Sequence, residues 1–228
     1  PDLVWLKARS STGYDHVLQD SVRGSTKQLY SNSTSAEVDD TDAVTSFDSS
    51  GFTTGADVTT NNSGVSYVAW AWDAGTGSAA SNTDGSITST VKANTAKGFS
   101  VVTFTNPSSG SGSIGHGLSV KPDMIITKAR SATGNWTVAH KSLGANMQDH
   151  YLLLNGTNAT TTSSGLWGGE PTSTVFYSSS ALQVPSATMI AYCTPKLFSE
   201  GQDFQSDEVS TETDREENKD TDQLFDQD

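Results

Sequence analysis

The sequence predicts an all-β protein built as an antiparallel β-sandwich. Apolar residues make up 33% of the chain and come mostly in short bursts of Val, Ile, Leu and aromatic residues. Ser, Thr, Asn, Gly and Asp separate these bursts, which is typical of strands joined by turns. No stretch keeps apolar residues at helical spacing over the length of a helix, so we expect almost no helix.

Two imperfect copies of one unit follow each other along the chain. PDLVWLKARSSTG, residues 1–13, aligns with PDMIITKARSATG, residues 122–134, with eight identities in thirteen positions and an offset of 121. Further matches pair Asn32, Thr34 and Ala36 with Asn155, Thr157 and Ala159, and Val68, Ala69 and Trp70 with Ile190, Ala191 and Tyr192. The offset changes by only one or two, as expected where loops vary and strands persist. We therefore expect two related repeats.

Both repeats divide into the same succession of strands. In the first repeat we expect strands at residues 2–9, 16–20, 28–32, 43–47 and 67–72. In the second we expect them at residues 99–105, 123–130, 135–140, 151–155, 174–177 and 189–193. The first strand is apolar on both faces, which places it in the middle of a layered structure.

Composition divides the chain into four segments. Residues 1–73 form the first repeat, residues 87–195 form the second, and residues 74–86, which lack bulky apolar side chains, are expected to be a flexible linker. Residues 196–228 carry 12 acidic and 3 basic side chains, so we expect a disordered acidic C-terminal tail. Its role is either an interaction tail or a solvated terminus.

Charge and apolar content argue against several partners. Residues 1–195 hold 14 acidic and 10 basic side chains, which gives no attraction for phosphate backbones, so we expect no nucleic-acid binding. No apolar stretch approaches the ~20 residues that span a bilayer, so we expect no membrane insertion. Cys193 is the single cysteine and leaves the compartment open.

Several strings carry a resemblance to a known family. SFDSSGFT, YVAWAW, IGHGLSVKPDMIITKAR and MIAYC, in this order, resemble a repeat family found in virion proteins of marine bacteriophages, and the similarity covers residues 1–195. The resemblance implies a sandwich of the concanavalin and laminin-G type, often called a jelly roll. It also implies a place on the virion surface, as a tail, fibre or capsid decoration domain that contacts other virion proteins and host-surface glycans.

Two departures from this family bear on the organisation. Family members carry a further strand and turn before the Pro-Asp segment, as residues 99–120 provide for the second repeat, so we expect the first repeat to be incomplete at its N-terminus. The acidic tail lies outside the resemblance. Because phage appendages are commonly trimeric and strand edges need covering, we expect a homo-oligomer, with a trimer as the first choice.

Aromatic and histidine side chains supply the first candidate binding residues. Trp167, in SGLWGGEP, is the aromatic side chain we expect to be exposed and able to stack on a sugar; the alternative is that it plugs the end of the sandwich. His116, between two glycines, lies either in a ligand-facing loop or in a structural turn. Trp5, Trp70 and Trp72 fall in predicted strands, so we expect at least two of them in the core.

Charged residues supply the second set of candidates. Lys128 and Arg130 repeat the pair Lys7 and Arg9. They are expected to bind an anionic sugar, to pair with Asp2 or Asp123, or to be solvated at the strand end. Asp39, Asp40 and Asp42 could offer oxygen ligands to calcium, although they lack the EF-hand spacing; a solvated acidic loop is the alternative. We expect no other cofactor.

These observations favour a protein that is not an enzyme, with mechanical and adhesive work in a virion. Two other functions stay open. The first is a purely structural capsid decoration or assembly protein, and the second is a glycan-degrading enzyme on a jelly-roll scaffold. An enzyme of that kind needs two carboxylates facing one groove, and the sequence offers no such pattern.

Overall fold

A computed structural model describes residues 1–195, so the predicted acidic tail, residues 196–228, lies outside the described residues. The described chain is all-β, its sheets are antiparallel, and its single helix has four residues, as the sequence predicted. β-branched and aromatic residues dominate the strands, as in FSVVTFT of β10 (Phe99–Thr105), because they pack well on a pleated surface. The one helix in residues 1–195 lacks the length and apolarity needed to cross a membrane.

The first sheet has five strands in the order β4-β3-β2-β1-β7. These strands are β1 (Leu3–Ala8), β2 (Val17–Asp20), β3 (Lys27–Tyr30), β4 (Val38–Asp39) and β7 (Tyr67–Trp72). The strand expected at residues 2–9 is therefore present, and β7 has the predicted bounds.

The second sheet has eight strands in the order β15-β14-β13-β12-β17-β10-β9-β8. Besides β10, these are β8 (Ala80–Asn82), β9 (Ser89–Asn94), β12 (Met124–Ala129), β13 (Thr137–His140), β14 (His150–Leu153), β15 (Thr161–Thr162) and β17 (Thr188–Thr194). The sequence predicted β10, β12, β13, β14 and β17 but not β8, β9 or β15.

Two hairpin-sized sheets complete the fold. One pairs β5 (Val44–Phe47) with β6 (Phe52–Thr54), and the other pairs β11 (Ser111–Gly115) with β16 (Val175–Ser179). α1 (Val58–Asn61) begins at Asp57, whose side chain accepts a hydrogen bond from Thr59 N. It ends after one turn, because Asn62 returns to an extended backbone.

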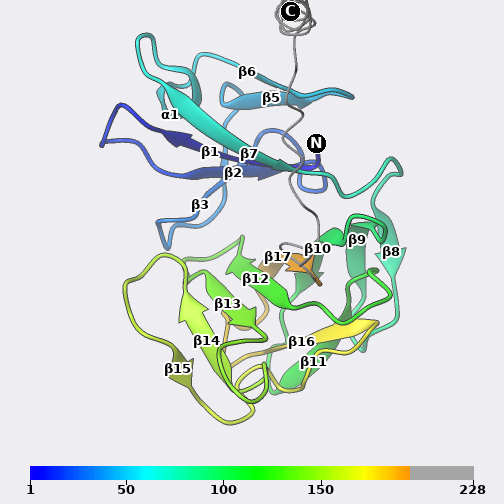
Figure 1. The fold of residues 1–228 in the computed structure, drawn as a ribbon. Helices are drawn as coiled ribbons and strands as arrows, with labels where there is room; N and C mark the ends of the chain where they lie inside the picture. Colours follow the sequence, from blue (N-terminus) through cyan, green and yellow to red (C-terminus); the bar gives the residue numbers. More distant parts are fainter. Residues whose placement is uncertain (196–228) are drawn as a thin grey trace, which may run out of the picture. The chain divides into compact units, whose positions relative to one another are not determined.

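These sheets stack in layers, and three apolar clusters fill the spaces between them (Figure 1). Leu3 and Leu18 of the five-stranded sheet pack with Val101 and Tyr192 of the eight-stranded sheet in the middle cluster. A second cluster lies between the first sheet and β5, and the third lies between the second sheet and the β11–β16 pair. The two large sheets thus share one core, and β1 is buried on both faces, as predicted.

Five strands occupy the same places in both large sheets. The order β4-β3-β2-β1-β7 corresponds to β15-β14-β13-β12-β17 at the sequence offsets of the two aligned copies. Matching hydrogen bonds recur in each: Arg9 N to Ser66 O and Arg130 N to Thr188 O, both 2.7 Å; His16 N to Asn32 Oδ1 and Trp136 N to Asn155 Oδ1, both 2.8 Å. Residues at matching places are called equivalent below. The eight-stranded sheet continues beyond β17 into β10, β9 and β8, whereas the five-stranded sheet ends at β7.

The segment 74–86 differs from the expected flexible linker. Ala80–Asn82 form β8 and pair with Ser89–Val91 of β9, and Ala74 is buried in the middle cluster. The absence of bulky side chains does not indicate a flexible linker here, because a sheet ladder needs only backbone N–H and C=O groups. Small residues therefore build an edge strand here without supplying core.

Candidate functional site

A buried ion cluster joins the two large sheets. Its centre is Arg23, which lies just after β2 and whose side chain is fully buried. Arg23 Nε lies 2.5 Å from Asp20 Oδ2 and Arg23 Nη1 lies 2.9 Å from Glu37 Oε2. Arg23 Nη2 donates to Leu18 O at 3.1 Å and contacts Tyr192 Oη at 3.2 Å. The guanidinium therefore has a partner on every side, which a buried cation requires.

The second repeat contributes the other half of the cluster. Arg130 Nε and Nη2 donate to the two oxygens of Glu37, each at 2.8 Å, which is the bidentate geometry that favours arginine. Tyr192 Oη donates to Asp20 Oδ2 at 2.8 Å. Glu37 N also donates to Arg130 O at 2.8 Å. Residues from both large sheets and from the loops beside them thus form one ion cluster in the space between the sheets.

The charges in this cluster hold each other ionised. Burial alone raises the pKa of Glu37, but hydrogen bonds from Arg130 and Arg23 outweigh it, so the pKa lies below its usual value. Burial alone lowers the pKa of Arg23, but Asp20, Tyr192 and Glu37 together bring it above its usual value. Every carboxylate of the cluster is committed to a cation. The arrangement links the two large sheets through paired charges.

Lys128 lies next to this cluster and is fully buried. Its Nζ donates to Ala129 O at 2.7 Å. Burial lowers the pKa of Lys128 to about 8, and the nearby Glu37 opposes the shift only in part. A buried ammonium with so little compensation is a cost to the fold.

An aromatic cluster lies along the β7 side of the middle core. The Trp5 and Trp70 rings meet edge-on with centroids 6.2 Å apart, and Trp72 stacks on Phe99 at 6.1 Å. Trp70 is 48% exposed, which makes it the most exposed aromatic side chain among the large apolar residues of the described chain. Trp5 Nε1 is buried and has no hydrogen-bond partner within residues 1–195.

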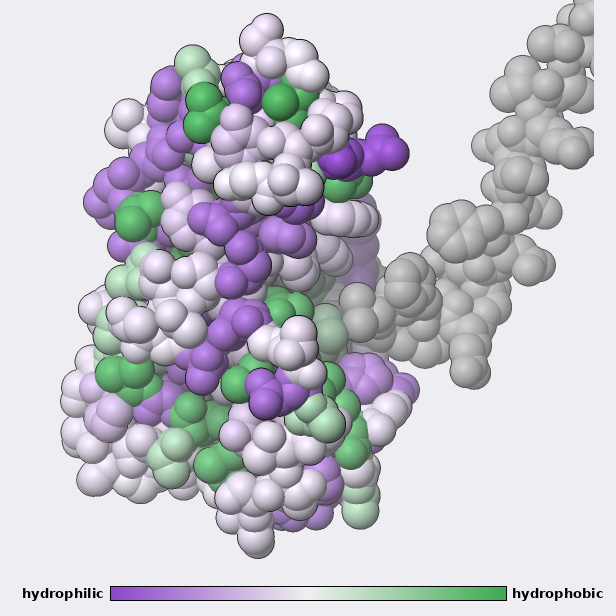
Figure 2. All heavy atoms as spheres, turned by 90° about the vertical axis from the view of Figure 1, so that its left-hand side faces the viewer, coloured by the Kyte–Doolittle hydropathy of each residue, from purple (hydrophilic) through white to green (hydrophobic). Residues whose placement is uncertain are grey.

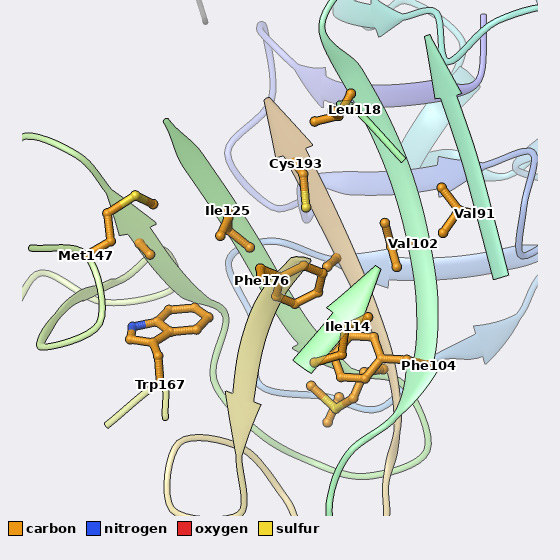
Figure 3. Packing of buried hydrophobic residues seen from close by; sticks show 14 of the residues in the cluster. Val91, Val102, Phe104, Ile114, Leu118, Ile125, Met147, Trp167, Phe176 and Cys193 are labelled. Atoms are coloured by element: carbon orange, nitrogen blue, oxygen red, sulfur yellow. The ribbon is translucent and has the colours of Figure 1, made fainter. Parts of the chain in front are cut away.

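Trp167 contradicts the expectation that it is exposed. Its side chain is 3% exposed and lies in the core beside Met147 (Figure 3). Trp167 Nε1 donates to His150 O at 3.1 Å. Glycines on both sides suggested a free loop, but the loop folds back over the sheet and inserts the ring, so this indole cannot stack on a sugar.

His116 lies in a structural turn instead of a ligand-facing loop. It is fully buried, its Nδ1 accepts from Leu118 N at 3.2 Å and its Nε2 lies 3.3 Å from Thr172 O. Gly117 supplies the positive φ of 70° that this turn requires. Burial lowers the pKa of His116, so the ring stays neutral near pH 7.

Neither Lys128 nor Arg130 is free to bind an anionic sugar, because Lys128 is fully buried and the Arg130 guanidinium is held by Glu37. Arg130 pairs with Glu37, and not with Asp2 or Asp123 as the alternative held. Asp2 instead accepts from Lys92 Nζ at 2.6 Å, and Asp123 accepts from Lys141 Nζ at 2.7 Å. The sequence had no means of showing this, because Glu37 lies in a polar loop far from either repeat strand.

Asp39, Asp40 and Asp42 do not converge. Lys27 Nζ lies 2.5 Å from Asp39 Oδ1, and Asp40 Oδ1 accepts from Asp42 N at 2.8 Å and from Ala43 N at 3.1 Å. No group of three or more potential ligands among residues 1–195 is arranged to hold a metal ion. Adjacent aspartates in a turn satisfy backbone donors, so the solvated acidic loop describes them better than a calcium site.

The residues that do come together were missed for identifiable reasons. Asp20, Arg23 and Glu37 carry no motif, and only the tertiary fold brings them to Arg130. Trp70 was not singled out, because the sequence predicted only that at least two of Trp5, Trp70 and Trp72 lie in the core. The sequence did contain a signal for an open sheet edge at Trp70, namely the length of the uncharged segment YVAWAW, residues 67–72.

The remaining surface has no single large apolar area in the view of Figure 2, where hydrophobic residues form small separate groups among hydrophilic ones. A shallow polar groove of about 570 Å³ lies between the loop after β7 and the strands β8 and β9. Its walls include Asp73, Asn82, Lys92 and Asn94. Lys97 lies 3.0 Å from Asp73 and neutralises that wall.

Comparison with known proteins gives one match. The family model described as Domain of unknown function (DUF7483) matches residues 1–206. Neither the search of curated proteins nor the search of solved structures found a match. Because the model covers most of the 228 residues, the chain belongs to the DUF7483 family.

Proposed function

We propose that this chain is a non-enzymatic structural and adhesive module on the surface of a bacteriophage virion, in its tail, a fibre or the head. The supporting observation is that two matching sheets share a core and a buried ion cluster, so that they form one stack. We also propose that the two sheets derive from two related repeats and that the fold is a concanavalin-like sandwich. The sequence resemblance described above supports the setting.

A module of this kind needs resistance to mechanical load and a surface that contacts neighbours. The ion cluster and the middle apolar cluster supply the first property, because separating the sheets exposes both charges and apolar surface. The open strand β7 and the exposed Trp70 supply the second. Carboxylates at the centre of the molecule are paired with cations, which supports a function other than catalysis.

Labelling of intact phage particles tests the setting. Antibodies against the purified full chain are expected to decorate purified particles at regular positions, which cryo-electron microscopy locates on the tail, fibres or head. Particles that carry no label, together with a chain recovered only from the soluble lysate, would contradict the proposal. A symmetry count at the labelled position tests the expected trimer.

Host-surface glycan contact is a second candidate function, and the exposed Trp70 favours it. A half-exposed indole beside a second indole offers a flat apolar face of the kind on which sugars stack. Trp70→Ala is expected to weaken binding of the chain to host cells about two- to twelvefold, since an aromatic contact of this kind contributes about 0.5–1.5 kcal/mol. Val38→Ala, at the other exposed edge of the same sheet, is the matched control.

Two outcomes of the cell-binding experiment redirect the proposal. If neither the unchanged chain nor the variants bind host cells, the glycan contact is wrong and a purely structural decoration protein remains. Release of reducing sugar from host polysaccharide by the purified chain would instead support a glycan-degrading enzyme.

A further inference from the structure

We propose that the free edge of β7 accepts an antiparallel β-strand from a different protein, and that this strand has the alternating apolar pattern of β10. Three observations support the proposal: the character of the β7 edge, the direction of its backbone groups, and the strand that covers the equivalent edge of β17. The inference goes beyond the proposed function, because it depends on neither a virion nor a glycan.

The edges of the two large sheets differ in how they are protected. Three of them are short: β4 and β15 have two residues each, and β8 has three. β7 has six residues, YVAWAW, without a charge or a proline. Short length, charge and proline are the usual ways of blocking an edge, and β7 uses none of them. An edge of this kind pairs readily with another strand.

The backbone of β7 presents free donors and acceptors along this edge. Arg9 N donates to Ser66 O, and the register pairs Lys7 with Val68 and Trp5 with Trp70. Since hydrogen-bonded and outward-facing residues alternate in an antiparallel pair, Val68 and Trp70 bond to β1. The N–H and C=O groups of Tyr67, Ala69 and Ala71 then point away from β1, and no residue within 1–195 bonds to them.

The equivalent strand β17 shows what a covered edge looks like. β10 pairs with it through Val102 and Ala191 and through Ser100 and Cys193. The residues of β17 that face β10 are the equivalents of Ala69 and Ala71. The same molecule thus contains a template for strand addition to β7, with its register.

The contacts of β10 also indicate which side chains a strand added to β7 needs. Val101 lies opposite Tyr192, the equivalent of Trp70, and Phe99 stacks on Tyr192 with ring centroids 6.4 Å apart. A strand on β7 in this register places an apolar side chain over the exposed Trp70. The next residue of the added strand points to the opposite face. There Ala69 and Ala71 are exposed and place little restriction on the side chain of that residue. The occupant therefore needs apolar residues at alternate positions only.

A peptide of residues 97–106, KGFSVVTFTN, tests the proposal against the full chain. Titration of this peptide is expected to shift the backbone amide signals of Tyr67, Ala69 and Ala71 in two-dimensional NMR spectra and to follow a saturable one-site curve. A scrambled peptide of the same composition is expected to produce no such shifts at the same concentrations. Absence of shifts at β7 up to the solubility limit of the peptide overturns the proposal.

Paired substitutions distinguish strand addition from nonspecific apolar binding. Val101→Glu in the peptide places a charge over Trp70 and is expected to weaken binding at least about tenfold, whereas Val102→Glu, on the open face, is expected to weaken it less than about threefold. In the protein, Ala69→Pro removes an outward N–H and is tolerated on an edge strand. It is expected to abolish binding, and Val38→Lys on β4 is expected to leave binding unchanged.

Three further results would assign the edge to another occupant. A dimer that forms without peptide and is lost in Ala69→Pro would mean that β7 pairs with β7 of a second copy. Shifts confined to β17 would mean that the peptide displaces β10. Protection of the β7 amides that vanishes on removal of residues 196–228 would assign the edge to the chain's own C-terminal segment. If Ala69→Pro fails to fold, Ala71→Lys, which adds an edge charge, replaces it.

Discussion

The two large sheets of this protein use the same five-strand order but differ in what lies beyond the fifth strand. β17 is followed by β10, β9 and β8, and six of its seven residues are buried. β7 is the last strand of its sheet, and Ala69, Trp70 and Ala71 are exposed. The same strand pattern therefore gives a closed interior in one repeat and an open edge in the other. Neighbouring strands, and not the strand's own sequence, decide its exposure.

A second difference concerns the residues that meet in the middle core. His16 and Trp136 occupy equivalent positions and donate the same backbone hydrogen bond to an asparagine side chain. Trp136 is fully buried and its Nε1 donates to Tyr30 O of the first repeat at 2.8 Å, whereas His16 lies partly exposed. At this position the eight-stranded sheet thus contributes a large side chain to the shared core, whereas the five-stranded sheet does not.

The largest expected effect follows from this pair. Trp136→Ala is expected to lower the free energy of unfolding by about 4 kcal/mol, because it leaves a large cavity and removes a hydrogen bond to the Tyr30 carbonyl. His16→Ala is expected to lower it by less than about 1 kcal/mol. Chemical denaturation of both variants measures the difference. Equal losses at the two positions would show that the halves contribute alike to the core.

The ion cluster gives the next comparison. Arg130→Gln is expected to destabilise the protein by about 2–3 kcal/mol, since it removes two charged hydrogen bonds and leaves Glu37 with one cation. The equivalent Arg9 is exposed, so Arg9→Gln is expected to change stability by less than about 0.5 kcal/mol. Glu37 adds a pH signature: its pKa is lowered by folding, so its contribution is present above pH ~4.5 and is lost as the pH falls further.

That signature has its own check. As the pH is lowered below ~4.5, the free energy of unfolding is expected to fall less steeply in Glu37→Gln than in the unchanged chain. If the free energies of unfolding of the two proteins fell in parallel with pH, Glu37 would not be among the residues that hold the sheets together at neutral pH.

Lys128 offers a stabilising substitution. Its pKa is lowered to about 8 from 10.5, so between these values the unfolded chain binds a proton that the folded chain has lost, and stability rises with pH. Lys128→Met removes the buried charge and is expected to raise the free energy of unfolding by about 2 kcal/mol at pH 7, with the gain shrinking between pH 8 and about 10. The equivalent Lys7 is only partly buried, so Lys7→Met is expected to change the free energy of unfolding at pH 7 by less than about 0.5 kcal/mol. Destabilisation of Lys128→Met at pH 7 would contradict this account.

The smallest expected effect tests the likeness of the repeats directly. Asn32 and Asn155 each accept a backbone N–H bond at 2.8 Å and donate to an equivalent side chain, Asp15 or Asn135. Replacement of either asparagine by alanine is expected to cost about 1 kcal/mol, with additive effects in the double variant. Losses that differ by more than about 1 kcal/mol would show that the two turns only look alike.

The sequence predicted the fold class and most central strands, because short apolar bursts between turns leave little freedom there. It missed β9 and β11, whose Ser, Thr, Gly and Lys residues resemble loops although their backbones pair in sheets. Strands of this composition depend on the neighbouring strands that accept their backbone bonds, and the pattern of a single segment does not encode those neighbours.

The candidate site was harder to predict than the fold. Trp167 and His116 lie between glycines, which the sequence cannot distinguish from a free loop, yet both are buried by distant strands. Lys128 and Arg130 were recognised as a recurring pair, but Glu37, the partner of Arg130, lies 93 residues away in the sequence. Trp70 becomes notable only when the five-stranded sheet is seen to end at β7.

Backbone amide hydrogen exchange of the full chain tests the difference between the two sheets most directly. The account predicts fast exchange at Ala69 and Ala71 and slow exchange at their equivalents Ala191 and Cys193, which bond to β10. It also predicts slower exchange at Trp70, whose N–H faces β1, than at its two neighbours. Equal protection of Ala69 and Ala191 would contradict the open edge, and with it the strand acceptor proposed for β7.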